Sequence, residues 1–198
     1  TMKADTTGLW PRYIWHVDQP HGDVSFMPMD QVSSLASREV KMVLTGDGGD
    51  ELFAGYEKYA TFFGNKDLNH LEKDWEQDFV RQSGLLHGEE AARLLSGELS
   101  QAFLDQDPYR ALSSQVLRAA HQDPINQVLF AETTTLLPGN NLVKPDRMAM
   151  ANSLEIRSPF LDYRLVEFAF KIPGHMKLAN GETKAILKKA VEPLLGHE

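Results

Sequence analysis

Hydrophobic positions in the N-terminal quarter of the chain follow first a strand-like and then a helical pattern. Residues 13–17 (YIWHV) are rich in aromatic and β-branched side chains, are closed by Asp-Gln-Pro, and predict a short buried strand. Residues 30–39 place apolar side chains at helical spacing, and the apolar run 41–45 predicts a second strand. This order is typical of a βαβ crossover, whose parallel strands bind ligands at their carboxyl ends. We therefore expect Asp18 and Asp47 at the carboxyl ends of a parallel pair.

The pattern becomes helical after the second strand. The predicted helices span residues 50–62, 70–83, 88–96, 108–120, 124–137, 146–153, 162–171 and 183–191. Trp75, Phe79 and Val80 lie at helical spacing and are expected in the core. Two strands alone make no stable sheet, so we expect a mainly α fold with a short parallel β pair whose sheet has further strands upstream.

The composition fits one globular domain. The chain has 198 residues, of which 42% are apolar and 24% charged, as in ordinary globular proteins. Acidic residues outnumber basic ones by 28 to 20, which disfavours nucleic acid and anionic membranes as partners. The sequence has no cysteine, which excludes a disulfide, a thiolate zinc site and a cysteine nucleophile within it and is compatible with the cytoplasm. No stretch is apolar enough for a membrane span or a signal peptide.

The most informative stretch is residues 43–56 (VLTGDGGDELFAGY), which indicates a strand, a glycine-rich turn and the start of a helix. Backbone N–H groups of such a turn and the positive end of the helix dipole suit phosphate. Asp47, Asp50 and Glu51 would repel a polyphosphate unless Mg²⁺ lay between them, so the motif predicts a nucleotide with magnesium. The alternative is that Asp50 and Glu51 only stabilise the helix N-terminus, by about 0.3–1 kcal/mol each.

Two further stretches complete the pattern: residues 136–162 (LLPGNNLVKPDRMAMANSLEIRSPFLD) and residues 181–187 (GETKAIL). Together with the glycine turn, and in this order, they closely resemble the asparagine synthetase family. The resemblance covers about residues 13–60 and 126–192. It implies the C-terminal portion of an α/β PP-loop ATP pyrophosphatase domain, which is adenine nucleotide alpha hydrolase-like.

The resemblance also implies roles for individual residues, beginning with the nucleotide. Thr45, Gly46 and Asp47, followed by Gly48, match the segment that contacts the AMP portion of ATP. Asp50 matches an aspartate that coordinates magnesium. ATP and Mg²⁺ are therefore the expected nucleotide and metal.

The resemblance assigns the chemistry to Lys184, Asp47 and Glu155. Glu155 matches a glutamate that lines the acyl-adenylate pocket together with the residue at position 47. Lys184 matches a lysine that steadies pyrophosphate and the charge developing during adenylation, a reaction governed by positioning and electrostatics. A lysine in the first turn of a helix opposes the helix dipole, which favours a functional role for Lys184.

Two arginines in the second stretch have two interpretations each. Arg147 and Arg157 could bind phosphate or a substrate carboxylate through the planar guanidinium. They could equally pair with Asp146, Glu155 or Asp162 in a structural network. Of the two, Arg147 is the better candidate for the site.

The chain also departs from the family that it resembles. The family has an upstream serine- and glycine-rich pyrophosphate loop, and an N-terminal glutaminase domain whose first residue is a cysteine. Neither is found here, so residues 1–198 are expected to be a single partial synthetase domain, a fragment of a longer enzyme. Pro145 replaces a usual aliphatic residue and is expected just before a helix that starts at Asp146.

The resemblance implies a whole enzyme that adenylates the side chain of aspartate and transfers ammonia from glutamine, giving asparagine, AMP and pyrophosphate. One alternative is a related amidotransferase that acts on another carboxylate, for instance in surface-polysaccharide or secondary-metabolite synthesis. Another is a non-catalytic module that retains the scaffold. The fragment alone is expected to be inactive, its expected partners are small molecules, and a homodimer is one option for its assembly.

Overall fold

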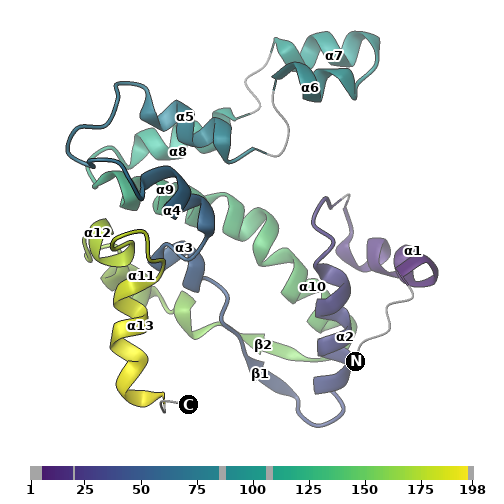
Figure 1. Cartoon of the computed structure of the whole chain (residues 1–198). Coiled ribbons are helices and arrows are strands. Elements are labelled where there is room, and N and C mark those ends of the chain that lie inside the picture. The colour runs from purple at the N-terminus through teal and green to yellow at the C-terminus, as the bar shows by residue number, and fades with distance from the viewer. Residues whose placement is uncertain (1–5, 20, 85–87, 106–108, 196–198) are drawn as a thin grey trace. The chain divides into compact units, whose positions relative to one another are not determined.

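The computed structural model describes residues 6–19, 21–84, 88–105 and 109–195, and it confirms a mainly α fold with one short parallel pair of strands (Figure 1). The main elements are α1 (Thr6–Val17), α2 (Phe26–Ala36), β1 (Met42–Leu44), α3 (Gly49–Phe53), α4 (Glu57–Phe63), α5 (Trp75–Gln82), α6 (Gly88–Arg93), α7 (Gly97–Leu104), α8 (Arg110–Arg118), α9 (Pro124–Thr134), α10 (Val143–Ala151), β2 (Glu155–Arg157), α11 (Tyr163–Ala169), α12 (Gly174–Lys177) and α13 (Ala185–Val191). A π-helical turn, η1 (Leu137–Asn141), and two 3₁₀ turns, η2 (Pro159–Leu161) and η3 (Glu192–Leu194), complete the set. Within the described residues, no helix has the length and apolar character needed to cross a bilayer.

The chain divides into two compact units. The first unit combines Thr1–Gly49 with Leu136–Phe168, and the second unit combines Asp50–Thr135 with Ala169–Glu198. Each unit has its own cluster of buried hydrophobic side chains. The glycine turn therefore belongs to the first unit, and helices α4 to α9 after it belong to the second.

The sheet of the first unit is the parallel pair β1–β2, in which Val43 lies opposite Ile156. One additional backbone bond extends the pair at its carboxyl end, from Thr45 N–H to the Arg157 carbonyl at 2.9 Å. Helix α10 packs against α1, α2 and β2, and the core of this unit contains Tyr13 and Phe26, whose ring centroids lie 5.6 Å apart. The strands thus lie at the edge of a small helical core.

The predicted strand at residues 13–17 is wrong, because these residues form the second half of α1. Tyr13 and Val17 are both buried, whereas Trp15 between them is 80% exposed. A strand would place all three on one face, while a helix places only residues four apart together. Asp18 consequently follows a helix, in a left-handed conformation, and not a strand. The predicted βαβ crossover is therefore wrong, and the parallel partner of β1 is β2.

The core of the second unit is largely aromatic. Phe79 is 1% exposed, and its ring centroid lies 5.3 Å from that of Phe62 and 5.8 Å from that of Phe63. Trp75 and Val80 are buried with it, which confirms the predicted core face of this helix. Helix α9 crosses the same cluster and begins with Asp123 as N-cap and a proline as its first residue, a favourable start for a helix.

Several predicted helices have the right type but different ends. The predicted helix 50–62 is two helices, α3 and α4, because Ala54 adopts a left-handed conformation between them. The predicted helix 124–137 ends at Thr134, and the predicted helix 146–153 starts earlier, at Val143, so Pro145 lies within its first turn and not before it. Helices α7 and α12 were not predicted. Pro20 and Pro108, which fall in a predicted turn and a predicted helix, lie outside the described residues.

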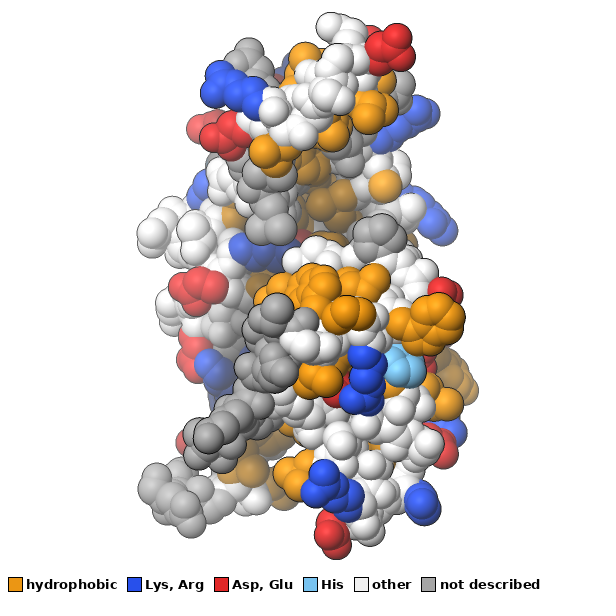
Figure 2. Space-filling model, turned by 90° about the vertical axis from the view of Figure 1, so that its right-hand side faces the viewer, with side chains coloured by type: hydrophobic (Ala, Val, Ile, Leu, Met, Phe, Trp, Pro, Cys, Tyr) orange, Lys and Arg blue, Asp and Glu red, His pale blue; other side chains and the backbone are white. Residues whose placement is uncertain are grey.

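The surface carries hydrophobic patches between scattered charges, as the face in Figure 2 shows. In the first unit, Leu44 is 68% exposed although it lies in a strand, and Met42 on the same face of β1 is also exposed. Only the alternate position, Val43, is half-buried. One face of the short parallel pair is therefore open to solvent in this chain, which is uncommon for parallel strands.

Candidate functional site

The glycine turn begins where β1 ends. The Thr45 hydroxyl donates to Asp47 Oδ2 at 2.7 Å, and Ser158 Oγ lies 3.0 Å from the same hydroxyl oxygen. A threonine hydroxyl has a single hydrogen, which here is given to Asp47, so Ser158 is the donor of the second bond. A directed chain from Ser158 through Thr45 therefore fixes one oxygen of the Asp47 carboxylate, and no bond to the other is found among the described residues.

The backbone of the turn depends on Gly48. Its φ of +88° is disfavoured for other residues, and a Cβ at this position would lie 2.3 Å from a methyl carbon of Leu161. The Gly49 N–H donates to the Gly46 carbonyl at 3.2 Å and closes the turn. At Gly46, in contrast, a Cβ would meet nothing within 4 Å. The turn is therefore packed on one side and open at Gly46, where a ligand could approach the backbone.

Glu155 lies at the amino end of β2, whereas Asp47 lies beyond the carboxyl end of β1. Residues two apart in a strand share one face, and Arg157 Nε accordingly donates to Glu155 Oε1 at 2.7 Å. The structure thus brings Glu155 to Arg157 and not to Asp47. Arg157 therefore pairs with Glu155, one of the acidic residues named above as its possible structural partners.

The remaining residues of this stretch are spread over the first unit. Arg147 is exposed on α10, next to the buried Met148. Asp162 pairs with Arg164 through two bonds of 2.9 and 2.8 Å, and these bonds lower the pKa of the Asp162 carboxyl to about 2. Asp162 is therefore held by its own neighbour and not by either predicted arginine.

The second unit brings together two predicted site residues that are far apart in sequence. Lys184 Nζ lies 2.9 Å from Asp50 Oδ1, and both side chains are about one-third exposed. Lys184 is not in the first turn of a helix as predicted but at the N-cap of α13, with a left-handed φ of +53°. Its backbone N–H donates to the Phe53 carbonyl at 3.1 Å, at the C-terminal end of α3. The helix-dipole argument for a functional role of Lys184 therefore does not apply. The unusual feature of this residue is instead its left-handed backbone conformation.

Glu51 differs from the other two carboxylates of the motif because it is only 2% exposed. Tyr56 donates its hydroxyl to Glu51 Oε1 at 2.6 Å. Burial, followed by this bond to a carboxylate, raises the pKa of Tyr56 far above its ordinary value. Glu51 therefore has a structural role in the second unit, as the alternative interpretation of the motif allowed for this residue.

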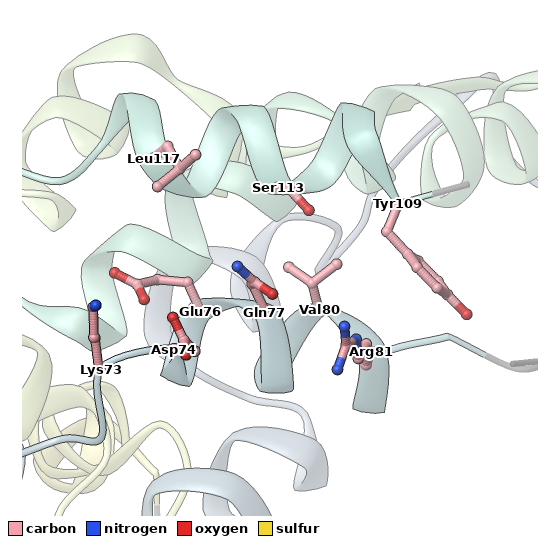
Figure 3. A pocket seen from close by; sticks show the side chains of 9 residues that line it. All are labelled: Lys73, Asp74, Glu76, Gln77, Val80, Arg81, Tyr109, Ser113 and Leu117. Carbon is pink, nitrogen blue, oxygen red and sulfur yellow. The ribbon is translucent and has the colours of Figure 1, made fainter. Parts of the chain in front are cut away.

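The predicted site residues lie outside a cavity of about 480 Å³ in the second unit (Figure 3). This cavity lies between α5 and α8, and its lining residues are Lys73, Asp74, Glu76, Gln77, Val80, Arg81, Tyr109, Ser113 and Leu117. Two of the lining side chains, Lys73 and Arg81, are basic, and two, Asp74 and Glu76, are acidic. Neither Asp50 nor Lys184 lines it, so the candidate residues are those of the glycine turn in the first unit and, separately, the Asp50–Lys184 pair in the second.

A sequence model of the asparagine synthase family matches residues 2–198, nearly the whole chain. The chain belongs to the asparagine synthase family. The synthase domain of this family has the PP-loop ATP pyrophosphatase fold, which agrees with the predicted fold class.

Relatives agree with this assignment. A provisionally named glutamine-hydrolyzing asparagine synthetase of Mycobacterium tuberculosis is 32% identical over 93% of this chain and 32% of its own length. Asparagine synthetase 1 (glutamine-hydrolyzing) of Bacillus subtilis is 29% identical over 93% of this chain and 33% of its own length. A Penicillium rubens protein named amidase chyE is 24% identical over the whole chain and 37% of its own length. The chain spans about a third of the length of these curated relatives.

For this member of the asparagine synthase family, sequence reasoning missed two residues that hold the predicted ones in place. Ser158 lies within the stretch 136–162 but was given no role in the site, because its contact with Thr45 depends on the pairing of β1 with β2. Gly55 was quoted within the motif but given no role, because its neighbours include Lys184 from the far end of the chain. The contacts of both residues form only in the folded chain, where segments distant in sequence come together.

Proposed function

We propose that this chain provides the nucleotide-binding and charge-stabilising part of an ATP-dependent, amide-forming site. Within the longer protein, residues 1–198 would form one part of the synthetase domain. The whole protein would convert aspartate, ATP and ammonia from glutamine into asparagine, AMP and pyrophosphate. Its substrates would be small molecules of the cytoplasm.

The observation that carries the proposal is the 2.9 Å ion pair between Asp50 and Lys184. The family resemblance assigns these residues separately, one to magnesium and one to pyrophosphate. A partly exposed ion pair contributes only about 0–1 kcal/mol to stability, whereas a strained left-handed residue costs on the order of 1–3 kcal/mol. The ion pair alone therefore does not offset the cost of this conformation, and we take a functional demand for the position of Lys184 as its further cause.

The donor set fits one magnesium ion that is held mainly by substrate. Within the described residues, no group of three or more carboxylates or histidines could bind a metal by itself. Magnesium, however, commonly takes one or two protein carboxylates and completes its shell with substrate phosphates and water. Asp50 would supply that carboxylate. The ion would shield the negative charge of the phosphates.

The protein groups would then divide the work of adenylation. The turn from Thr45 to Gly48 would orient the AMP portion, and Lys184 would bind the departing pyrophosphate. A carboxylate oxygen of aspartate would form a bond to the α-phosphorus while the bond to the pyrophosphate oxygen breaks. Ammonia would next attack the acyl carbon and release AMP.

Three further residues belong to this proposal in a weaker role. Asp47 and Glu155 would line the acyl-adenylate pocket, for which Glu155 would have to exchange its bond to Arg157 for one to the substrate. Arg147 is exposed, and its planar guanidinium is a group suited to phosphate or a carboxylate.

Another acceptor carboxylate is the second candidate. The relative named amidase chyE shows that proteins with other names resemble this chain over its whole length. A non-catalytic module that retains the scaffold is the third candidate. The acceptor therefore has to be tested directly.

The experiment is pyrophosphate release by the complete protein with Mg²⁺, ATP and saturating ammonia. Aspartate, glutamate and no acceptor are compared. Release that requires aspartate and yields asparagine supports the proposal. Release with another carboxylate alone identifies the related amidotransferase, and no release with any acceptor identifies the non-catalytic module.

A further inference from the structure

The backbone corner between α3 and α4, at residues 53–55, bonds to both residues of the Asp50–Lys184 pair. The Gly55 N–H donates to the Asp50 carbonyl at 2.9 Å, and the Lys184 N–H donates to the Phe53 carbonyl at 3.1 Å. Ala54 between them is fully buried, with a φ of +55°. The first bond closes the corner itself, and the second fixes the corner to the segment that carries Lys184.

The constraint at Gly55 is one of space and not of backbone conformation, because the flexible ends of two side chains would have to move aside for a Cβ. Its φ lies outside the left-handed region that favours glycine, unlike that of Gly48. A Cβ at position 55 would lie 1.9 Å from Asp50 Oδ1 and 2.2 Å from Lys184 Cε. Real Cβ atoms essentially never approach another heavy atom closer than 3.0 Å. Any side chain at this position would occupy the space in which the two charged groups meet.

We propose that Gly55 is a positioning residue, whose missing side chain lets Asp50 and Lys184 meet in the arrangement that receives magnesium and pyrophosphate. This inference rests on the proposed function. Gly55 touches neither substrate nor metal in this scheme. It acts through Asp50 and Lys184, whose side chains an added Cβ at position 55 would displace.

The first test measures the pair itself and needs no catalytic activity. Acylation of Lys184 by an amine-reactive ester is followed by mass spectrometry, with the exposed Lys189 on the same helix as internal standard. The ion pair shields Lys184 Nζ, so Gly55→Ala should raise its rate of acylation severalfold. Asp50→Asn, which breaks the pair with Gly55 intact, should do the same. The matched control is Gly22→Ala, because a Cβ there meets nothing within 4 Å. Equal rates in Gly55→Ala and Gly22→Ala would overturn the proposal.

A double-mutant cycle covers the case in which Gly55→Ala is poorly folded. Because the nearest atom to the added methyl belongs to Asp50, Asp50→Ala should remove much of the cost of Gly55→Ala. The readout is the midpoint of thermal unfolding by circular dichroism. A loss in midpoint that is the same in both backgrounds would contradict the clash with Asp50.

The second test separates positioning from folding by titrating MgATP into the folded chain in a calorimeter. Gly55→Ala should weaken MgATP binding by at least about tenfold, the loss expected for one charged contact, while Gly22→Ala should not change it. Unchanged affinity in Gly55→Ala would overturn the positioning role. If neither the unaltered chain nor the complete protein binds MgATP, the proposed function fails, and the acylation rates still decide whether Gly55 sets the pair.

Discussion

At the scale of single residues, substitutions of Lys184 and Asp50 should cause different kinetic defects, because the two side chains would act on different charges. Lys184 would stabilise charge that grows in the transition state, so Lys184→Ala should mainly lower kcat of the complete protein. Loss of one such preorganised partner typically costs about 10²–10³ in rate. The measurement is steady-state pyrophosphate release with saturating ammonia. A large rise in KM for ATP with unchanged kcat would contradict this role.

Asp50→Asn should instead raise the magnesium concentration needed for half-maximal rate, since an amide is a poorer ligand for a hard cation than a carboxylate. The same assay is repeated across a magnesium titration, with Lys184→Ala as the comparison. Lys184→Ala should leave the magnesium requirement nearly unchanged. Near-normal kinetics in both folded variants would indicate that Asp50 and Lys184 form only a surface ion pair.

A different lysine, Lys177, gives a prediction about stability. It is fully buried, and its ammonium donates to Asn126 Oδ1 at 2.7 Å and lies 5.0 Å from the centroid of the Phe170 ring. Burial lowers the pKa of Lys177 to about 8, although the nearby Asp123 charge acts in the opposite direction. The folded chain therefore releases this proton at a lower pH than the unfolded chain, whose lysine titrates near its ordinary value of 10.5.

Because the unfolded state holds more protons in this window, stability should rise with pH between about 8 and 10, on the order of 2 kcal/mol. Below pH 8 both states are protonated and the full cost of burying the charge remains. Above pH 10 the buried Tyr59, whose pKa is raised chiefly by burial, should reverse the trend. Urea unfolding as a function of pH measures this slope. Lys177→Met should lack the rise, and an equal rise in that variant would disprove the assignment.

At the scale of elements, the connection from β1 through the glycine turn to α3 makes unequal demands on its glycines. Gly48→Ala combines a left-handed backbone with a contact of 2.3 Å to Leu161, so it should destabilise the chain by roughly 1–3 kcal/mol. Gly46→Ala, two residues earlier, meets no neighbour and should change the free energy of unfolding by less than about 1 kcal/mol. Urea unfolding of both variants provides the measurement. Equal losses would show that the turn has another conformation.

The same connection shows how far sequence reasoning reaches. The strand at β1, the turn and the following helix start were predicted because all three signals are local. The run at residues 13–17 was misassigned because its aromatic and β-branched side chains suit a strand, while the packing of Tyr13 against Phe26 favours a helix. Tertiary contacts of this kind leave no local signal.

The candidate site divides in the same way. Asp50 and Lys184 were predicted from motifs, but their contact depends on the corner at Ala54, where the predicted single helix breaks. The direction of the hydroxyl chain from Ser158 depends on pairing between β1 and β2, whose second strand of three residues is too short for a pattern. The motif residues could therefore be found in the sequence, and the contacts that they make in the folded chain could not.

At the scale of the whole molecule, the chain has two hydrophobic clusters, one in each unit. The chain passes from one unit to the other at residues 49–50, 135–136 and 168–169. Compact units with their own cores often open as separate cooperative units. Of the residues named in the proposed function, the glycine turn belongs to the first unit and the Asp50–Lys184 pair to the second.

Hydrogen exchange followed by mass spectrometry can test whether the two units open separately. Phe79→Ala removes a ring from the centre of the second core, a change that typically costs 3–5 kcal/mol, and should speed exchange in α4, α5 and α9. Exchange in α2 and α10 should change much less. Phe26→Ala should show the reverse pattern, since Phe26 lies in the first core. Trp15→Ala is the control, because this side chain is 80% exposed and its loss should alter neither set. If Phe79→Ala speeds exchange equally in α9 and α10, the chain opens as one cooperative unit, and a defect in either core would reach the turn and the ion pair together.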